Sequence, residues 1–142
     1  MKLDIMPWSV CERSFVRLVK KDDFEVLSIV DGVKLRKKRA DESFMKKEYL
    51  SLVMEDYYEI IKELLVAYML KNGMRSRNHE CMMSYFLLKN SDCEIEARLI
   101  SQMFFYRNKL NYYGKKVPES FVLDNYDSFI KIVKLILRLI KR

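Results

Sequence analysis

The residues whose types and spacing could do chemistry cluster near the end of a helix predicted over residues 94–114. Arg107 and Asn108 stand shortly before Gly114, which suits the left-handed conformation that ends helices. At 3.6 residues per turn, Arg107 lies at the margin of the apolar stripe, so its guanidinium can reach out of the core. A guanidinium can bind a phosphate through two parallel hydrogen bonds, and Asn108 can orient it. The alternative is that Arg107 contacts the last carbonyls of the helix and that Asn108 and Asn111 are ordinary surface residues.

The helix over residues 94–114 must position this cluster. Its apolar residues recur every three or four positions, which lines one face of a helix. Ser91 and Glu94 fit the capping box that opens helices. We expect this to be the core helix around which the chain is organised. The predicted stripe consists of Ile95, Leu99, Met103, Tyr106, Leu110 and Tyr113.

The same reasoning along the chain predicts an all-α protein. With only three glycines and two prolines in 142 residues, the chain lacks the turn residues of an all-β fold. Short connections between amphipathic helices favour an up-and-down antiparallel bundle of five to six helices in a single domain, residues 1–142. Helices are predicted over residues 7–21, 22–39, 44–72, 79–89, 94–114 and 124–140, with a connection at 40–43 and a polar turn at 74–78. Asp22 or Asp23 and Asn78 are predicted N-caps, and Gly73 a helix end.

The charge and the cysteines bear on location and partners. The net charge of +7 favours polyanions or an acidic protein surface, although acidic residues are also numerous and interspersed. Cys11, Cys81 and Cys93 are odd in number and form no Cys-x-x-Cys motif, so we expect reduced thiols in a cytoplasmic protein. A disulfide between two of them stays open as the alternative. No apolar run reaches the ~20 residues that span a bilayer, so no membrane association is expected.

Three groups of basic residues are candidates for phosphate contacts. One closes the second predicted helix, one lies in the predicted turn, and one follows Gly114. For the first group, a helix C-terminus that merely tolerates cations is the simpler reading. The candidates are Arg36, Lys37, Arg39, Arg75, Arg77, Lys115 and Lys116.

A metal site is not expected. Glu55, Glu59 and Glu63 form a column of carboxylates, but the Glu-x-x-His motif of helical di-metal sites is absent. This column is predicted to be a solvated helix face whose carboxylates pair with nearby lysines. His79 is the single histidine. At a helix N-terminus its imidazolium form is disfavoured, so a neutral hydrogen-bonding role is predicted, and no cofactor is implied.

Two stretches together resemble the HEPN domains of archaea and bacteria. They are NGMRSRNHECMMSYFL at residues 72–87 and FFYRNKLNYYG at residues 104–114. The resemblance implies a helical bundle that commonly forms a homodimer, with the Arg-Asn motif near the dimer groove. Many members are ribonucleases or toxins of toxin–antitoxin pairs. Others are partners of minimal nucleotidyltransferases, and some are noncatalytic RNA-binding or accessory modules.

The chain departs from the nuclease pattern of that family, in which a histidine follows the arginine after four to six residues. Tyr112, Tyr113 and Gly114 occupy these positions here. A tyrosine, with an unperturbed pKa of about 10, is a poor base for attack by a ribose hydroxyl. Tyr112 or Tyr113 could instead stack on a base, and the resemblance suggests Tyr113 as an acceptor of AMP from a nucleotidyltransferase. Whether His79 replaces the missing histidine depends on its distance from Arg107.

Three functions therefore stay open. The first is a noncatalytic HEPN-like module that binds RNA, a nucleotide or a minimal nucleotidyltransferase around Arg107. The second is a metal-independent ribonuclease that uses Arg107 with His79 or a tyrosine. The third is a structural dimerisation or adaptor protein. An ion pair that seals Arg107 from every open surface would remove the first.

Overall fold

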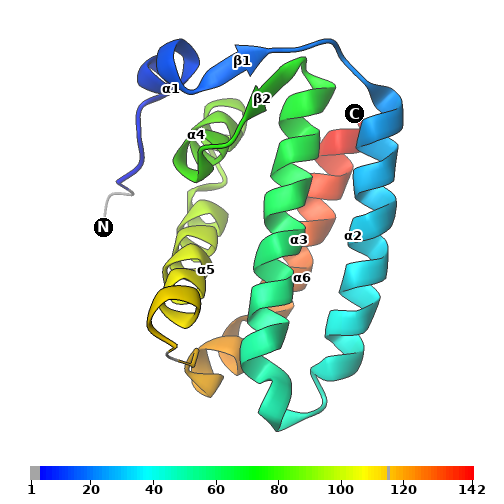
Figure 1. The fold of residues 1–142 in the computed structure, drawn as a ribbon, viewed down its shortest axis with the longest axis vertical. Coiled ribbons are helices and arrows are strands. Elements are labelled where there is room, and N and C mark those ends of the chain that lie inside the picture. Colours follow the sequence, from blue (N-terminus) through cyan, green and yellow to red (C-terminus); the bar gives the residue numbers. More distant parts are fainter. Residues whose placement is uncertain (1–3, 115) are drawn as a thin grey trace.

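The computed structural model of the protein describes residues 4–114 and 116–142, except for the side chains of residues 111–113. In this part of the chain, six α-helices form an all-α bundle with one short 3-10 helix and a two-stranded sheet, as the sequence predicts (Figure 1). The elements are α1 (Trp8–Ser14), β1 (Val16–Leu18), α2 (Asp23–Ser43), η1 (Lys47–Tyr49), α3 (Leu50–Lys71), β2 (Met74–Ser76), α4 (His79–Lys89), α5 (Glu94–Tyr113) and α6 (Glu119–Lys141).

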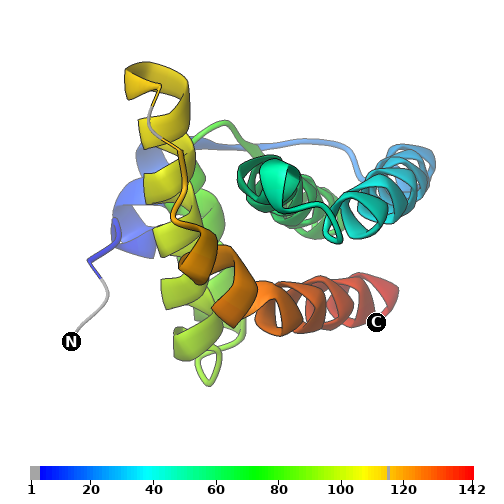
Figure 2. The same ribbon diagram turned by 90° about the horizontal axis from the view of Figure 1, so that it is seen from below.

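The long helices alternate in direction. In Figure 1, α2 descends, α3 rises, α4 and α5 descend one after the other, and α6 rises again. Seen from below, α2, α3 and α6 lie on one side of the molecule and α4 with α5 on the other (Figure 2). None of the helices in residues 4–114 and 116–142 is long and apolar enough to cross a membrane.

Helix α3, rather than α5, is the centre of the fold. It packs against α2, α4, α5 and α6, and it buries residues on most of its circumference. The prediction that the chain is organised around residues 94–114 is therefore wrong. Leu99 and Met103 of α5 are buried as predicted, but Ile95 is 81% exposed, because the first turn of α5 contributes only one side to the core. The buried residues of α3 are Leu50, Val53, Met54, Tyr57, Tyr58, Ile60, Ile61, Leu64, Leu65, Ala67, Tyr68, Met69 and Leu70.

A short antiparallel two-stranded sheet replaces two predicted features. The first predicted helix stops at Ser14, and β1 then pairs with β2, which lies within the predicted turn at residues 74–78. The pairing is extended by Val19, whose backbone N–H donates to the carbonyl of Gly73 at 2.9 Å. The side chain of Ser76 donates to the carbonyl of Phe15, also at 2.9 Å. Each segment thereby provides hydrogen-bond partners for backbone groups of the other. No pattern within either segment predicts this pairing.

Other predicted boundaries shift because buried contacts extend or shorten helices. Helix α2 continues through residues 40–43, the predicted connection, since Ala40 is fully buried. Helix α3 begins at Leu50 rather than at Phe44, after the 3-10 helix. Helix α6 begins at Glu119, directly after Pro118, rather than at the predicted residue 124.

Most predicted helix ends are confirmed. The side chains of Asp22 and Asn78 accept hydrogen bonds from the third residue of α2 and of α4. Gly73 and Gly114 adopt φ of +77° and +62°, a conformation that favours glycine. The predicted capping box is wrong, because Cys93 is the N-cap of α5 and its cap has no side-chain hydrogen bond.

The expectation of three reduced cysteines is corrected. Cys11 of α1 and Cys81 of α4 form a disulfide across 70 residues of chain, with their Cα atoms 5.4 Å apart. Both are fully buried, and packing of α1 against α4 brings them together. Cys93 is a buried free thiol.

A polar network joins α2, α3 and α6 on the far side of α3 from α5. The hydroxyls of Tyr57 and Tyr126 both donate to Oδ1 of Asp41, and Nζ of Lys37 lies 2.7 Å from Oδ2. Phe44 stacks on Tyr126 with ring centroids 3.7 Å apart. Burial alone would raise the pKa of Asp41, but the hydrogen bonds from Lys37, Tyr126 and Tyr57 outweigh burial and lower it. The ionised Asp41 therefore stabilises the fold at neutral pH, and this contribution is lost as the pH falls through the folded pKa, below about 3.9.

We predict that Tyr57→Phe lowers the free energy of unfolding by about 1–2 kcal/mol, because the ionised Asp41 loses a buried hydrogen-bond donor while the ring stays in place. Urea denaturation followed by circular dichroism measures this. Tyr49→Phe, at an exposed tyrosine, is the matched control and should change the free energy by less than about 0.5 kcal/mol. Equal effects of the two substitutions would contradict the assigned role of Tyr57.

Candidate functional site

Arg107 and His79 line the same pocket, between α3, α4 and α5. The pocket has a volume of about 450 Å³. Arg107 comes from the last turns of α5, whereas His79 is the first residue of α4, where Asn78 caps the helix. Tyr58 and Lys62, one helical turn apart on α3, form the wall between them. The lining residues are Met6, Tyr58, Lys62, Arg77, Asn78, His79, Glu80, Phe104 and Arg107.

The guanidinium of Arg107 is held by α3. Its Nη2 donates to Oε1 of Glu59 at 2.9 Å, and its Cζ lies 5.5 Å from the centre of the Tyr58 ring. Lys62 contacts the other oxygen of Glu59 at 3.1 Å. The Arg107 side chain is nevertheless 25% exposed and lines the pocket. It is thus paired within the chain but not sealed from solvent.

His79 is held in its neutral form. Its Nδ1 lies 2.8 Å from the hydroxyl of Tyr58, and its ring stacks on Phe104 with centroids 3.9 Å apart. Burial, with the positive charges of Lys62 and Arg107, lowers the pKa of His79 to about 4. Burial also raises the pKa of Tyr58. The phenol therefore donates to Nδ1, which assigns the imidazole proton to Nε2.

This arrangement leaves His79 poorly suited to remove a proton. The nitrogen that could act as a base already accepts a hydrogen bond from Tyr58. Nε2 of His79 and Nε of Arg107 are buried, and neither has a hydrogen-bond partner among the described residues. Such atoms are rare in native proteins and call for a structural or functional explanation. The pocket offers cationic and N–H groups, which suit an anion.

The other residues predicted on α5 do not join the pocket lining. Asn108 follows Arg107 but faces elsewhere and is half-buried. Asn111, Tyr112 and Tyr113 belong to α5, and their side chains lie outside the described residues. Their predicted roles in stacking or in accepting AMP stay predictions.

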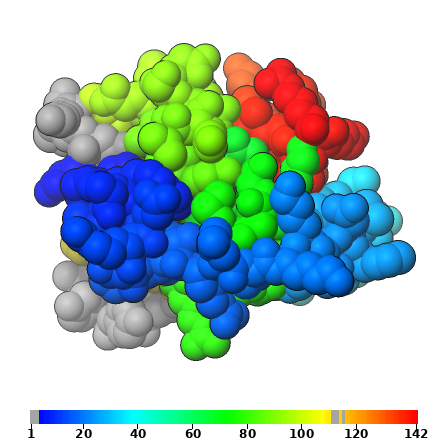
Figure 3. Space-filling view, turned by 90° about the horizontal axis from the view of Figure 1, so that it is seen from above, coloured from blue at the N-terminus to red at the C-terminus, as the bar shows by residue number. Residues whose placement is uncertain are grey.

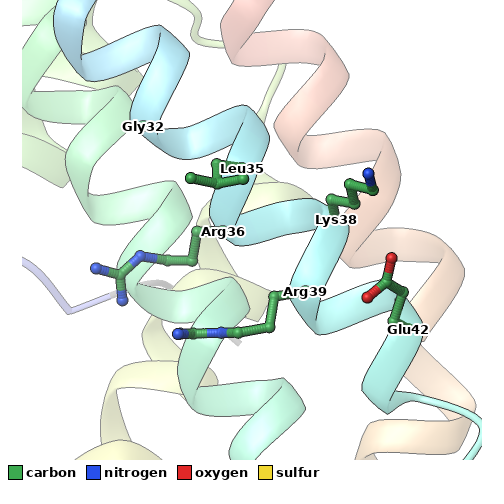
Figure 4. A pocket seen from close by; sticks show the side chains of 6 residues that line it. All are labelled: Gly32, Leu35, Arg36, Lys38, Arg39 and Glu42. Atoms are coloured by element: carbon green, nitrogen blue, oxygen red, sulfur yellow. The ribbon is translucent and has the colours of Figure 1, made fainter.

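The basic run of α2 is largely neutralised by its own neighbours. Arg39 donates to Asp56 at 3.0 Å, and Lys37 contacts Asp41. Arg36 lies 4.0 Å from both Asp56 and Glu63 of α3. Figure 4 shows Arg36 and Arg39 extending toward α3 beside a shallow pocket, whereas Lys38 extends away from it. These ion pairs compete with any phosphate at this surface.

The remaining basic candidates lie at opposite ends of the bundle. Arg75 belongs to β2 and donates to Glu25 at 2.6 Å, and Arg77 follows β2 and lines the pocket of Arg107 and His79. Lys116 is exposed between α5 and α6. Lys115 lies outside the described residues.

Sequence reasoning missed the residues of α3 and α5 that hold the site together. Glu59 was predicted to be a solvated carboxylate that answers lysines, and it does contact Lys62, yet it also pairs with Arg107 and is only 18% exposed. The residues predicted from the sequence include neither Tyr58 nor Phe104 as part of the site. The one available signal was the two consecutive tyrosines at positions 57 and 58, since only one of two neighbouring residues can point into the same core face of a helix.

The described residues contain no group of three or more His, Cys, Asp or Glu side chains that could hold a metal ion.

No protein-family model, curated protein sequence or solved structure matches this chain in comparisons of sequence and fold.

We predict that His79 stays neutral well below pH 6. Because it is the only histidine, its ring signals in a proton NMR spectrum need no isotope labelling to be assigned. They should show no titration between pH 7 and pH 5.5, with a midpoint near the pKa of about 4. A midpoint near 6.5 would contradict the burial and the Tyr58 hydrogen bond.

The same pKa difference affects stability. Between pH 6.5 and about 4 the unfolded chain binds a proton at His79 that the folded chain does not. Stability is therefore complete above pH 6.5 and decreases as the pH falls through this window, by at most about 3 kcal/mol. His79→Gln, which can still accept a hydrogen bond from Tyr58, should show a smaller decrease in urea denaturation.

Proposed function

We propose that this protein is a noncatalytic accessory module that binds a phosphate group of RNA or of a nucleotide in the pocket of Arg107 and His79. The observation that carries the proposal is the convergence of Arg107, Lys62 and Arg77 on one open pocket together with a histidine kept neutral. It accords with the resemblance of residues 72–87 and 104–114 to HEPN domains.

The charges and donors of the pocket suit a phosphate. Arg107 presents up to five N–H donors, of which the pair with Glu59 uses only part, and a guanidinium matches two phosphate oxygens. Arg77 has no ion-pair partner among the described residues. The N-terminus of α4 adds the positive end of an 11-residue helix. Glu80 opposes this attraction, although its carboxylate already accepts the backbone N–H of Met6 at 3.1 Å.

The state of His79 argues for binding rather than cleavage. Metal-independent RNA cleavage needs a group that accepts the proton of the 2′-hydroxyl, and a suitable base has a pKa near the working pH. The pKa of His79 lies at about 4, and its basic nitrogen accepts a hydrogen bond from Tyr58. While Tyr58 donates to its Nδ1, His79 is therefore a weak base at neutral pH, and its part in the proposed binding is to shape the pocket.

A metal-independent ribonuclease is the second candidate. One observation favours it, namely that Arg107 and His79 share a pocket although 28 positions separate them in the chain (107 − 79). If a bound phosphate displaced Tyr58 from Nδ1 of His79, the imidazole would be free to accept a proton. Association as a homodimer, or with a minimal nucleotidyltransferase, rests on the HEPN resemblance alone.

We predict that Arg107→Ala weakens binding of single-stranded RNA about tenfold, because a charge-assisted hydrogen bond to a phosphate is lost. Fluorescence anisotropy with a labelled oligonucleotide, at several salt concentrations, measures the affinity and its salt dependence. Arg98→Ala is the matched control, since Arg98 also lies on α5 and pairs with Glu94 at 2.8 Å outside the pocket. It should leave the affinity within about twofold.

Two outcomes of this experiment would count against the proposal. Equal affinity of the wild type and Arg107→Ala would remove the pocket from RNA or nucleotide binding. RNA that is recovered cut after incubation between pH 5 and pH 8, and that stays intact with His79→Ala, would establish the ribonuclease instead.

We also predict that Glu59→Gln strengthens binding about three- to tenfold, because Arg107 and Lys62 lose an internal anion that competes with the phosphate. Glu63→Gln, one turn further along α3, makes the same change in net charge outside this pocket and should have a smaller effect. An equal gain in both variants would indicate only a long-range effect of charge. A loss of affinity in a folded Glu59→Gln would show that the contact by which Glu59 holds Arg107 matters more for binding than its competition with the phosphate.

A further inference from the structure

A second basic pocket adjoins the first, and Arg77 lines both. The second pocket has a volume of about 470 Å³ and lies on the two-stranded sheet of β1 and β2. Figure 3 shows this end of the molecule, where the chain from α1 through β1 crosses beside the green residues of β2. Its lining residues are Ser14, Phe15, Val16, Arg17, Arg75, Ser76 and Arg77.

Strand pairing places two arginines side by side in this second pocket. Arg17 of β1 lies directly opposite Arg75 of β2 in the antiparallel register, so their side chains leave the same face of the sheet. Arg75 pairs with Glu25, whereas the described residues include no ion-pair partner for Arg17. Like charges that face each other across a pair of strands are unfavourable, and a bound anion would relieve this repulsion.

An exposed aromatic ring lies among these arginines. Phe15 lines the second pocket and is 46% exposed. Its backbone is fixed, because its N–H donates to Cys11 and its carbonyl accepts from Ser76. An exposed ring on a fixed backbone, next to cations, is the arrangement on which unpaired bases stack in proteins that bind single strands.

We propose that the two pockets are adjacent subsites of one binding track for single-stranded RNA, with the backbone of the RNA passing Arg77. In the first subsite, Arg107 and Lys62 hold one phosphate. In the second, Arg17 and Arg75 hold a neighbouring phosphate, and Phe15 stacks on an unpaired base. This inference rests on the proposed function and specifies its ligand as an oligonucleotide rather than a mononucleotide.

The charges along the track favour this ligand. The cationic side chains of the two linings are Lys62, Arg107, Arg17, Arg75 and Arg77, against the carboxylates Glu59, Glu25 and Glu80 that they or their neighbours contact. The cationic excess is spread over two pockets, so a ligand with a single phosphate uses only part of it. A duplex keeps its bases paired and offers none to Phe15.

The test compares three labelled or competing ligands: a nucleoside 5′-monophosphate, a single-stranded oligoadenylate of eight residues, and an RNA duplex of the same length. The variants are Arg17→Ala, with Arg138→Ala on α6 as the control in neither lining, and Phe15→Leu, with Phe24→Leu as a control at another exposed phenylalanine. Leucine keeps apolar bulk but removes the aromatic face. Circular dichroism establishes that each variant is folded.

We expect Arg17→Ala and Phe15→Leu each to weaken binding of the oligoadenylate about fivefold or more and to weaken binding of the monophosphate less, because Arg107 and Lys62 can still hold its single phosphate. Arg17→Ala should also reduce the slope of log K against log salt concentration by about 0.7, the loss of one phosphate contact to a single strand. Arg107→Ala should weaken both ligands. The controls should match the wild type.

Each contrary result has a distinct meaning. If the monophosphate binds through Arg107 but the oligoadenylate binds no more tightly, or if Arg17→Ala behaves like Arg138→Ala, the track is overturned and the proposed function stands. If the duplex binds as tightly as the single strand, the stacking subsite is overturned. If no ligand depends on Arg107, the proposed function fails and the track fails with it.

Discussion

The burial of two consecutive tyrosines on α3 constrains both halves of the molecule. Neighbouring residues of a helix point about 100° apart, so Tyr57 and Tyr58 face different partners. Both are essentially inaccessible to solvent, and a buried hydroxyl without a hydrogen bond is costly. Tyr57 finds Asp41 of α2, whereas Tyr58 finds His79 of α4. One pair thereby fixes α2 against α3, and the other fixes the start of α4, from which the candidate pocket is built.

The pocket follows from this second pair. Tyr58 donates to His79, its ring lies under the guanidinium of Arg107, and the next residue, Glu59, accepts a hydrogen bond from the same guanidinium. A single turn of α3 thus orients one residue from each of α4 and α5. Because these contacts lie at the buried base of the pocket, the pocket-facing groups are fixed before any ligand arrives.

Local signals predicted the helix ends that have a capping side chain or a terminal glycine, whereas nonlocal contacts displace several of the other ends. The caps at Asp22 and Asn78 and the glycines 73 and 114 depend on residues within one turn, and all four were predicted. The two-stranded sheet joins segments whose paired residues, such as Arg17 and Arg75, are far apart in the chain, and neither strand is long enough to show a pattern of its own. Arg107 and His79 were predicted as candidates from their residue types, but Glu59 and Tyr58 could not be, because a column of glutamates on a helix says nothing about which neighbour lies across from it.

Net charge was an equally incomplete guide. The densest basic run, in α2, lies against carboxylates of α3 and of α2 itself, so most of its charge is compensated. The sparser arginines in and next to the two-stranded sheet include Arg17 and Arg77, for which the described part of the chain provides no ion-pair partner. Where positive charge is available to a ligand depends on the fold's pairing of charges rather than on their density along the sequence.

The disulfide between Cys11 and Cys81 has a consequence for recognition. Cys81 lies two residues after His79, and Cys11 lies one turn before Phe15, so the bond ties the wall of one pocket to the wall of the next. By closing a loop of 70 residues it also limits how far α1 can move away from α4. A flexible chain that associates with such a surface loses its own conformational freedom, but the surface loses little, because its covalent geometry is already set. In the oxidised protein the two pockets therefore keep a constant distance from each other.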